Sequence, residues 1–141
     1  MARGSPVVTV EAVAERIRGT FPGEIGVEPL ELTDELARGR LRIEERHLHP
    51  GGFVHGGVVV TLADTVAAWG TIRHLSEDQF HTTVEMKVNL FGPARLGDAL
   101  TATGVPLHVG KRTQVWEVRV EREGDLRASF TCTQMVLDRG G

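Results

Sequence analysis

The chain has 141 residues, which is enough for one domain with a hydrophobic core of its own. Lys and Arg total 16 against 19 Asp and Glu, for a net charge of −3, and no long block of one sign occurs. This balance argues against a nucleic-acid-binding protein, as does the absence of tyrosine. The longest apolar run, residues 58–69, is too short to span a bilayer, so no membrane partner is expected.

Cys132 is the only cysteine, and it lies in an alternating, strand-like stretch. It cannot form an internal disulfide, which indicates a small core residue in a reducing compartment. No N-terminal segment combines a basic start with an apolar stretch. We therefore expect a cytoplasmic protein with one domain over residues 1–141.

Hydrophobic periodicity predicts a short amphipathic helix over residues 10–18, with Thr9 as its N-cap. Phe21-Pro22-Gly23 is expected to break this helix. Two strands are predicted next, over residues 25–32 and 37–45, because apolar and charged residues alternate in the second of them.

A loop rich in histidine and glycine, residues 47–57, leads into a helix that is apolar on all sides and reaches about Thr71. A helix of this kind is buried. Asp64 would therefore lie where a carboxylate is costly, because burial disfavours its charged form. Such an acid either bonds a neighbouring strand or carries a function.

Four further strands are predicted, over residues 82–90, 99–109, 115–121 and 126–137. In the first of them Val84, Met86, Val88 and Leu90 are expected on the buried face. The fold class is thus α+β, with a curved antiparallel sheet wrapped around one long helix. Since such a sheet has two open edges, we expect a homodimer that continues the sheet.

His55-Gly56-Gly57 stands where the central helix begins. The first amides of a helix have no partner within it, so they can hold an anion or a developing oxyanion. His55 and Asp64 are nine residues apart, which is about half a turn out of phase on a continuous helix. Either His55 bends round from the loop, or Gly57 of one subunit works with Asp64 of another.

Asp64 is the residue best placed for hydrolysis, as general base for a water or as nucleophile. No Gly-x-Ser-x-Gly motif occurs, and Cys132 is far along the chain. His47, His49 and His55 offer an alternative as metal ligands, but no Cys or acid stands at a typical ligand spacing, so no metal is expected.

One stretch resembles the signature of a known family. His49-Pro50-Gly51-Gly52-Phe53-Val54-His55-Gly56-Gly57, followed by Leu62-Ala63-Asp64, is similar to hotdog-fold acyl-CoA thioesterases of the phenylacetic-acid-pathway and 4-hydroxybenzoyl-CoA branch. The likeness covers about residues 25–137. It implies a hotdog fold in dimers that often pair into tetramers.

The resemblance also implies roles for residues. Asp64 would be the catalytic carboxylate, the Gly57 amide would polarise the thioester carbonyl, and His55 would help to hold the loop. Thr83 matches a hydroxyl residue that assists in some members. His49 stands where the family usually has Asn or Gln, which is a departure from the pattern.

Substrate contacts are expected around these residues. Gly56 allows close approach of a ligand, Thr82 stands beside Thr83, and Ala68 lies on a helix surface that suits an aryl or medium acyl chain. Lys111 and Arg112 resemble the family's basic contact with the phosphates of coenzyme A, although two basic residues at a turn are also typical of a solvated tip.

These observations predict an acyl-CoA thioesterase that acts on aryl or short to medium acyl-CoA substrates and needs no cofactor. One alternative is a hotdog hydratase or dehydratase of enoyl or hydroxyacyl thioesters, in which His49 or His55 would do the acid–base work. The other is a non-catalytic module that binds acyl-CoA or acyl-carrier groups. The burial expected for Asp64 argues against the second alternative.

Overall fold

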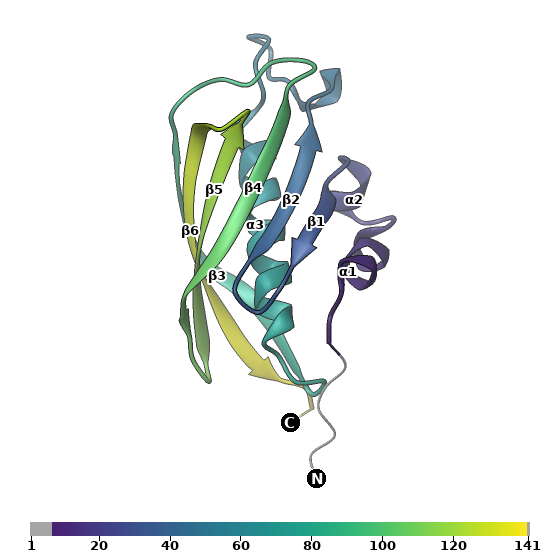
Figure 1. Ribbon diagram of the computed structural model, residues 1–141, viewed down its shortest axis with the longest axis vertical. Coiled ribbons are helices and arrows are strands. Elements are labelled where there is room, and N and C mark those ends of the chain that lie inside the picture. The colour runs from purple at the N-terminus through teal and green to yellow at the C-terminus, as the bar shows by residue number, and fades with distance from the viewer. Residues whose placement is uncertain (1–6, 141) are drawn as a thin grey trace.

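In the computed structural model, which describes residues 7–140, a six-stranded antiparallel sheet wraps around one long helix (Figure 1). The helices are α1 (Val10–Ile17), α2 (Phe21–Glu24) and α3 (Gly56–Arg73), with a 3-10 turn at Glu45–His47. The strands are β1 (Glu28–Leu32), β2 (Ala37–Arg42), β3 (Gln79–Leu90), β4 (Ala99–Val109), β5 (Thr113–Arg122) and β6 (Asp125–Asp138). The predicted fold class, a hotdog fold, is confirmed.

The core lies between α3 and the inward-facing side chains of the sheet. Trp116 and Phe130 are the largest fully buried residues, and α3 contributes Leu62 and Val66, both with no exposed surface. The helix comes close to β5 at Gly70, where an added Cβ would lie 2.3 Å from the Trp116 ring. The predicted burial of the central helix is therefore correct for its sheet-facing side.

The N-terminal segment differs from the prediction in one element. Thr9 caps α1 as expected, since its Oγ1 accepts the Ala12 N–H at 3.1 Å. Phe21-Pro22-Gly23, which was predicted to be only a break, begins the short helix α2. Pro22 lies in its first turn, where the missing N–H costs nothing because that amide would have no partner within the helix.

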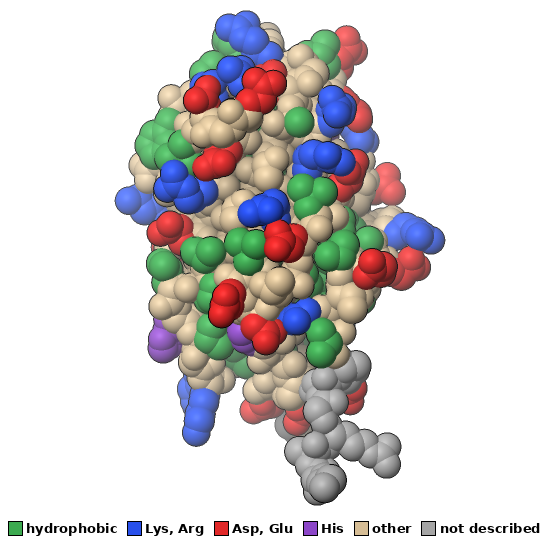
Figure 2. Space-filling model, in the orientation of Figure 1, with side chains coloured by type: hydrophobic (Ala, Val, Ile, Leu, Met, Phe, Trp, Pro, Cys, Tyr) green, Lys and Arg blue, Asp and Glu red, His purple; other side chains and the backbone are tan. Residues whose placement is uncertain are grey.

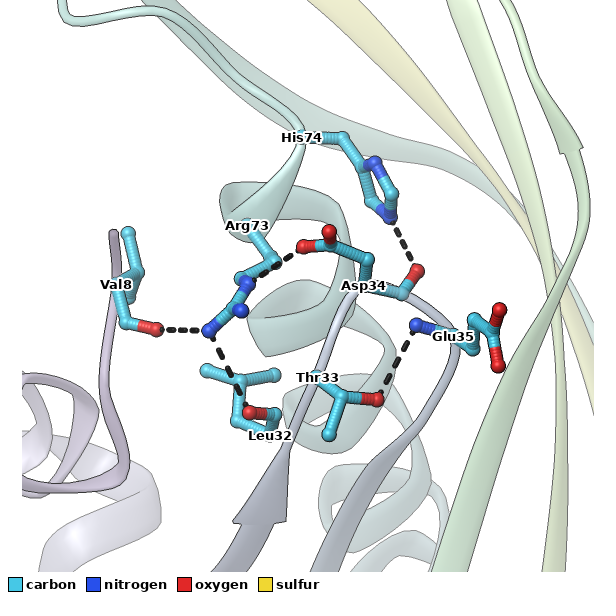
Figure 3. Close-up of polar contacts among 7 residues, drawn as sticks. All are labelled: Val8, Leu32, Thr33, Asp34, Glu35, Arg73 and His74. Carbon is cyan, nitrogen blue, oxygen red and sulfur yellow. Dashed lines mark hydrogen bonds and ion pairs between the residues drawn. The ribbon is translucent and has the colours of Figure 1, made fainter. Parts of the chain in front are cut away.

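Arg73, at the end of α3, ties three segments together (Figure 3). Its Nε donates to Asp34 Oδ1 at 2.8 Å, and its Nη1 donates to the carbonyl oxygen of Val8 at 2.7 Å. His74 Nε2 donates to the Asp34 carbonyl at 2.8 Å. The Arg73 hydrogen bond holds the pKa of the Asp34 carboxyl below its ordinary value. These contacts fix the turn between β1 and β2 to the end of the central helix.

The strand order is β1-β2-β4-β5-β6-β3, so β3 is an edge strand, and among the described strands its one neighbour is β6. The pairing shifts at Val84, because Thr83 lies opposite Gln134 whereas Glu85 lies opposite Thr133. Val84 is thus an extra residue, a β-bulge. No prediction covered this bulge or the pairing of β3 with β6.

The apolar side chains of β3 are not buried as predicted. Val84, Met86 and Leu90 are 51%, 44% and 53% exposed, and only Val88 packs against the core. Met86 pairs with buried Cys132, so it does point to the inner face. It remains exposed because β3 is the edge of the sheet and no residue between 7 and 140 covers it.

Positive and negative side chains are interspersed over the face of the molecule seen in Figure 2, with no area of one sign. None of the helices within residues 7–140 combines the length and the hydropathy that crossing a membrane requires.

Candidate active site

Asp64 lies in the middle of α3, partly buried rather than fully buried. Its Oδ1 accepts a hydrogen bond from Thr83 Oγ1 at 2.9 Å. The carboxylate opens onto a groove of about 470 Å³. Apolar side chains of α1, α2, α3 and β3 form most of the groove wall, namely Ile17, Phe21, Ala68, Trp69, Ile72 and Met86. An acid with a hydroxyl partner therefore faces a space with apolar walls.

The bulge at Val84 explains how Thr83 reaches Asp64. In a regular strand Thr83 and Met86 would point to opposite faces, because side chains alternate. One extra residue between them shifts the phase, so both point inward. The adjacent Thr82 is exposed and pairs with Met135 on the outer face. The structure thus brings Thr83 to Asp64 and Ala68 to the wall of its groove, and it turns Thr82, a predicted substrate contact, to the other face of the sheet.

The start of α3 is capped by a side chain. His55 is the N-cap residue, and its Nδ1 accepts the N–H of Gly57 at 2.8 Å. The amide that was predicted to polarise a carbonyl is therefore engaged by His55 in this structure. Gly56 and His49 line a different cavity, of about 300 Å³, together with Leu90 and Arg127.

Gly57 and Asp64 do not meet within one chain. Both belong to α3, seven residues apart, which corresponds to about 10 Å along the helix axis. A donor and a catalytic carboxylate must each come within about 3 Å of the reacting atoms. One chain therefore does not place both groups at the same carbonyl.

The three loop histidines share one arrangement, in which Nδ1 accepts a backbone N–H close in sequence. The donors are Glu44 for His47, Gly51 for His49 and Gly57 for His55, each at 2.8 Å. His47 is 1% exposed and also donates from Nε2 to the Ile25 carbonyl at 2.7 Å. Within residues 7–140 no three His, Cys, Asp or Glu side chains are arranged to hold a metal ion.

Lys111 and Arg112 are exposed at the turn between β4 and β5. They line a cavity with His74 and Asp138, and neither lines the Asp64 groove. The structure of one chain therefore does not bring these two predicted phosphate contacts to the acid.

Two polar residues beside Thr83 were not predicted. Gln134 is fully buried, and its Oε1 lies 3.0 Å from Thr83 Oγ1 and 2.9 Å from His81 Nδ1. A signal was present in the sequence. Because Cys132 was predicted to be a core residue, alternation places residue 134 on the same inner face, where a polar side chain needs a partner.

A long helix wrapped by an antiparallel sheet defines the class of hotdog-fold proteins, and in this one an acid faces a groove with apolar walls. Comparison with known proteins agrees. Residues 51–129, more than half of the chain, match the thioesterase superfamily. The chain belongs to this superfamily, and the predicted enzyme class, a thioester hydrolase, is confirmed.

Individual relatives are moderately similar. A protein from Pasteurella multocida (strain Pm70) is 35% identical over 83 residues, which are 59% of each chain. A 1,4-dihydroxy-2-naphthoyl-CoA hydrolase from Listeria monocytogenes is 33% identical over 99 residues, or 70% of this chain and 80% of the relative.

Solved structures resemble the chain over most of its length. A mutant thioesterase from Pseudomonas aeruginosa superposes with a TM-score of 0.89 at 21% identity and covers 96% of this chain and 97% of that one. At this identity the likeness shows the fold alone. A hypothetical thioesterase from Streptococcus pneumoniae, determined with coenzyme A, has a TM-score of 0.73 at 25% identity and covers 82% and 89%.

Proposed function

We propose that this thioester hydrolase cleaves acyl-CoA substrates to the free acid and coenzyme A, with Asp64 as general base or nucleophile. The observation that carries the proposal is the Asp64 carboxylate, bonded to Thr83 and open to a groove with apolar walls. The hydrolase from Listeria and the structure with coenzyme A support the choice of substrate class.

The groove supports two mechanisms at Asp64. As a base, the carboxylate takes a proton from a water that attacks the thioester carbonyl. As a nucleophile, it attacks that carbon itself, expels the CoA thiolate and leaves an anhydride that water then opens. In both, the Thr83 hydroxyl orients the carboxylate. Phe21 and Trp69 would form the apolar wall for an aryl or medium acyl group, and Ala68 leaves room for it.

The active unit is a homodimer in this proposal, with the option of a dimer of dimers. β3 has a free edge 12 residues long, whereas β1, at the other edge, has five residues and contains Pro29. Exposed Val84, Met86 and Leu90 lie along β3. Pairing of two β3 edges would cover these side chains and complete the sheet.

In the dimer, the Gly57 amide of one copy donates a hydrogen bond to the thioester carbonyl, and Asp64 of the other copy acts on the same carbonyl as base or nucleophile. His55 must first rotate, because its ring now accepts the Gly57 N–H. Lys111 and Arg112 are proposed to contact the phosphates of coenzyme A. A cytoplasmic location is also proposed, supported by the single reduced Cys132.

Release of the coenzyme A thiol from aryl, short-chain and medium-chain acyl-CoA substrates tests the proposal. Asp64→Asn keeps the shape of the side chain and removes its basicity, so turnover should fall at least about a hundredfold. Asp125→Asn is the matched control, because Asp125 is exposed at the turn between β5 and β6. It should retain wild-type turnover.

Other outcomes separate the alternatives. Undiminished turnover by a folded Asp64→Asn protein would remove Asp64 from the mechanism. Hydration of an enoyl-CoA without thiol release would indicate the hydratase, and tight binding without either reaction would indicate a binding module.

A further inference from the structure

We propose that His81 and Gln134 are positioning residues that fix the Thr83 hydroxyl as a hydrogen-bond donor to Asp64. This inference rests on the proposed role of Asp64 as the catalytic carboxylate. Asp64 and Thr83 are joined at 2.9 Å, Thr83 and Gln134 at 3.0 Å, and Gln134 and His81 at 2.9 Å. The chain of contacts thus runs from α3 through β3 to β6 and back to β3.

The count of protons restricts the direction of these bonds. A threonine hydroxyl has one proton to donate, and an ionised carboxylate only accepts. If Gln134 presents its oxygen to both Thr83 and His81, only two protons are available for the three contacts, one from the Thr83 hydroxyl and one from a protonated His81 Nδ1. With the Thr83 proton on Asp64, the oxygens of Thr83 and Gln134 would then face each other at 3.0 Å with no proton between them.

Rotating the Gln134 amide by half a turn satisfies every group. The oxygen and nitrogen of the amide have almost the same shape, so the exchange moves no neighbour. The two N–H protons then go to Thr83 Oγ1 and His81 Nδ1, and the Thr83 proton goes to Asp64. The Gln134 oxygen turns to Cys132 Sγ, 3.4 Å from the present nitrogen. Burial raises the pKa of the Cys132 thiol to about 11, so it keeps the proton that this bond needs.

This arrangement gives His81 a defined role. Its Nδ1 must be an acceptor, which places the ring proton on Nε2. A His81 with a proton on Nδ1 would instead hold the Gln134 oxygen, which would then lie beside the Thr83 hydroxyl as a second acceptor in competition with Asp64. His81 does not touch Asp64. It acts on the carboxylate through Gln134 and Thr83.

The direct test is the tautomer of His81, measured by 15N–1H correlation NMR of imidazole nitrogens in the wild-type protein. The signal of His81 is assigned by its absence from the spectrum of a His81→Asn variant. We expect the proton on Nε2 and an unprotonated Nδ1. A proton on Nδ1 would overturn the proposal, whatever the activity of the enzyme.

Kinetics supply the second test. His81→Phe keeps a ring and removes the acceptor, so kcat for thioester hydrolysis should fall about tenfold with KM little changed, as for other residues that orient a reactive group through a partner. His81→Asn places an amide oxygen near the former Nδ1, so it should recover most of that loss. Equal kcat in wild type and His81→Phe, or equal loss in both variants, would contradict the proposal.

Asp64→Asn in the same assay distinguishes this inference from the proposed function. If Asp64→Asn retains turnover, the role of Asp64 fails. If Asp64→Asn is inactive and His81→Phe behaves as wild type, only the positioning role fails.

Discussion

Asp64 lies on a helix whose sheet-facing side chains are apolar, and the Thr83 hydroxyl is the group that compensates its carboxylate. Hydrogen bonds to charged groups contribute about 1.5–3 kcal/mol each, so one such bond offsets much of the cost of partial burial. The groove leaves the rest of the carboxylate accessible. The Thr83 hydrogen bond thus stabilises the partly buried Asp64 carboxylate while the groove leaves it open to a substrate, as the proposed role requires.

Cys132, unlike Asp64, is fully buried, and its burial makes the thiol unreactive. Its pKa of about 11 leaves roughly one thiol in a thousand ionised at pH 8, and the thiolate is the reactive form. We therefore expect no fast reaction of the folded protein with a chromogenic disulfide at pH 8, and one reactive thiol per chain after denaturation. Cys132→Ala, as control, should show none in either state. Fast labelling of the folded protein would contradict the burial.

At the scale of elements, the contact between α3 and β5 depends on Gly70. The Trp116 ring lies against it and cannot easily move, because the ring has no exposed surface and its Nε1 donates to Gln114 Oε1 at 3.0 Å. A glycine within a helix costs about 1 kcal/mol relative to alanine. At residue 70 glycine is needed all the same, because the helix can approach the Trp116 ring only where no side chain lies between them.

Gly70→Ala should consequently destabilise the protein, although alanine is the better helix former. Overpacking a core costs about 1–3 kcal/mol, which exceeds the gain of about 1 kcal/mol in helix propensity. The measurement is the free energy of unfolding by denaturant. The same substitution in a Trp116→Phe background should cost less, since the smaller ring leaves space. A Gly70→Ala protein as stable as the wild type would show that the contact can relax.

At the scale of the whole molecule, the proposed active site draws on two copies of the chain. Gly57 and Asp64 are about 10 Å apart along α3, and the edge strand β3 exposes a row of apolar side chains. Both observations are explained together by a second copy of the chain. Light scattering should therefore give at least twice the mass of one chain.

Mixing inactive variants tests whether the site is shared. Gly57→Pro removes the amide proton at a helix position where proline is tolerated, and Asp64→Asn removes the base. A dimer with one subunit of each kind has one intact site out of two. After random exchange of equal amounts, we expect about a quarter of wild-type turnover, because half of the dimers are mixed.

The control is the mixture without subunit exchange, which should stay inactive like each variant alone. If exchange is shown by mass spectrometry and no activity returns, each site lies within one subunit, and His55 must bend round toward Asp64 of its own chain.

Periodicity in the sequence predicted the elements that depend on local pattern. The strand over residues 99–109 has the predicted bounds, and the central helix is present where the apolar run indicated. Strand order was not predictable in this way, because the pairing of β3 with β6 is nonlocal. The proposed role of Thr83 came from family resemblance, whereas its contact with Asp64 depends on a bulge that alternation does not reveal.

The bulge at Val84 also has a consequence for insertions and deletions. Thr83 and the inward row that begins at Met86 are three positions apart, so they share a face only while the extra residue is present. If one residue were deleted here, Thr83 and Met86 would point to opposite faces of the sheet. Either Thr83 would still contact Asp64, or the apolar row would still face inward, but not both. A substitution in β3 can alter the Thr83 hydroxyl or the apolar row separately, whereas a change in the length of β3 alters how the two are placed relative to Asp64.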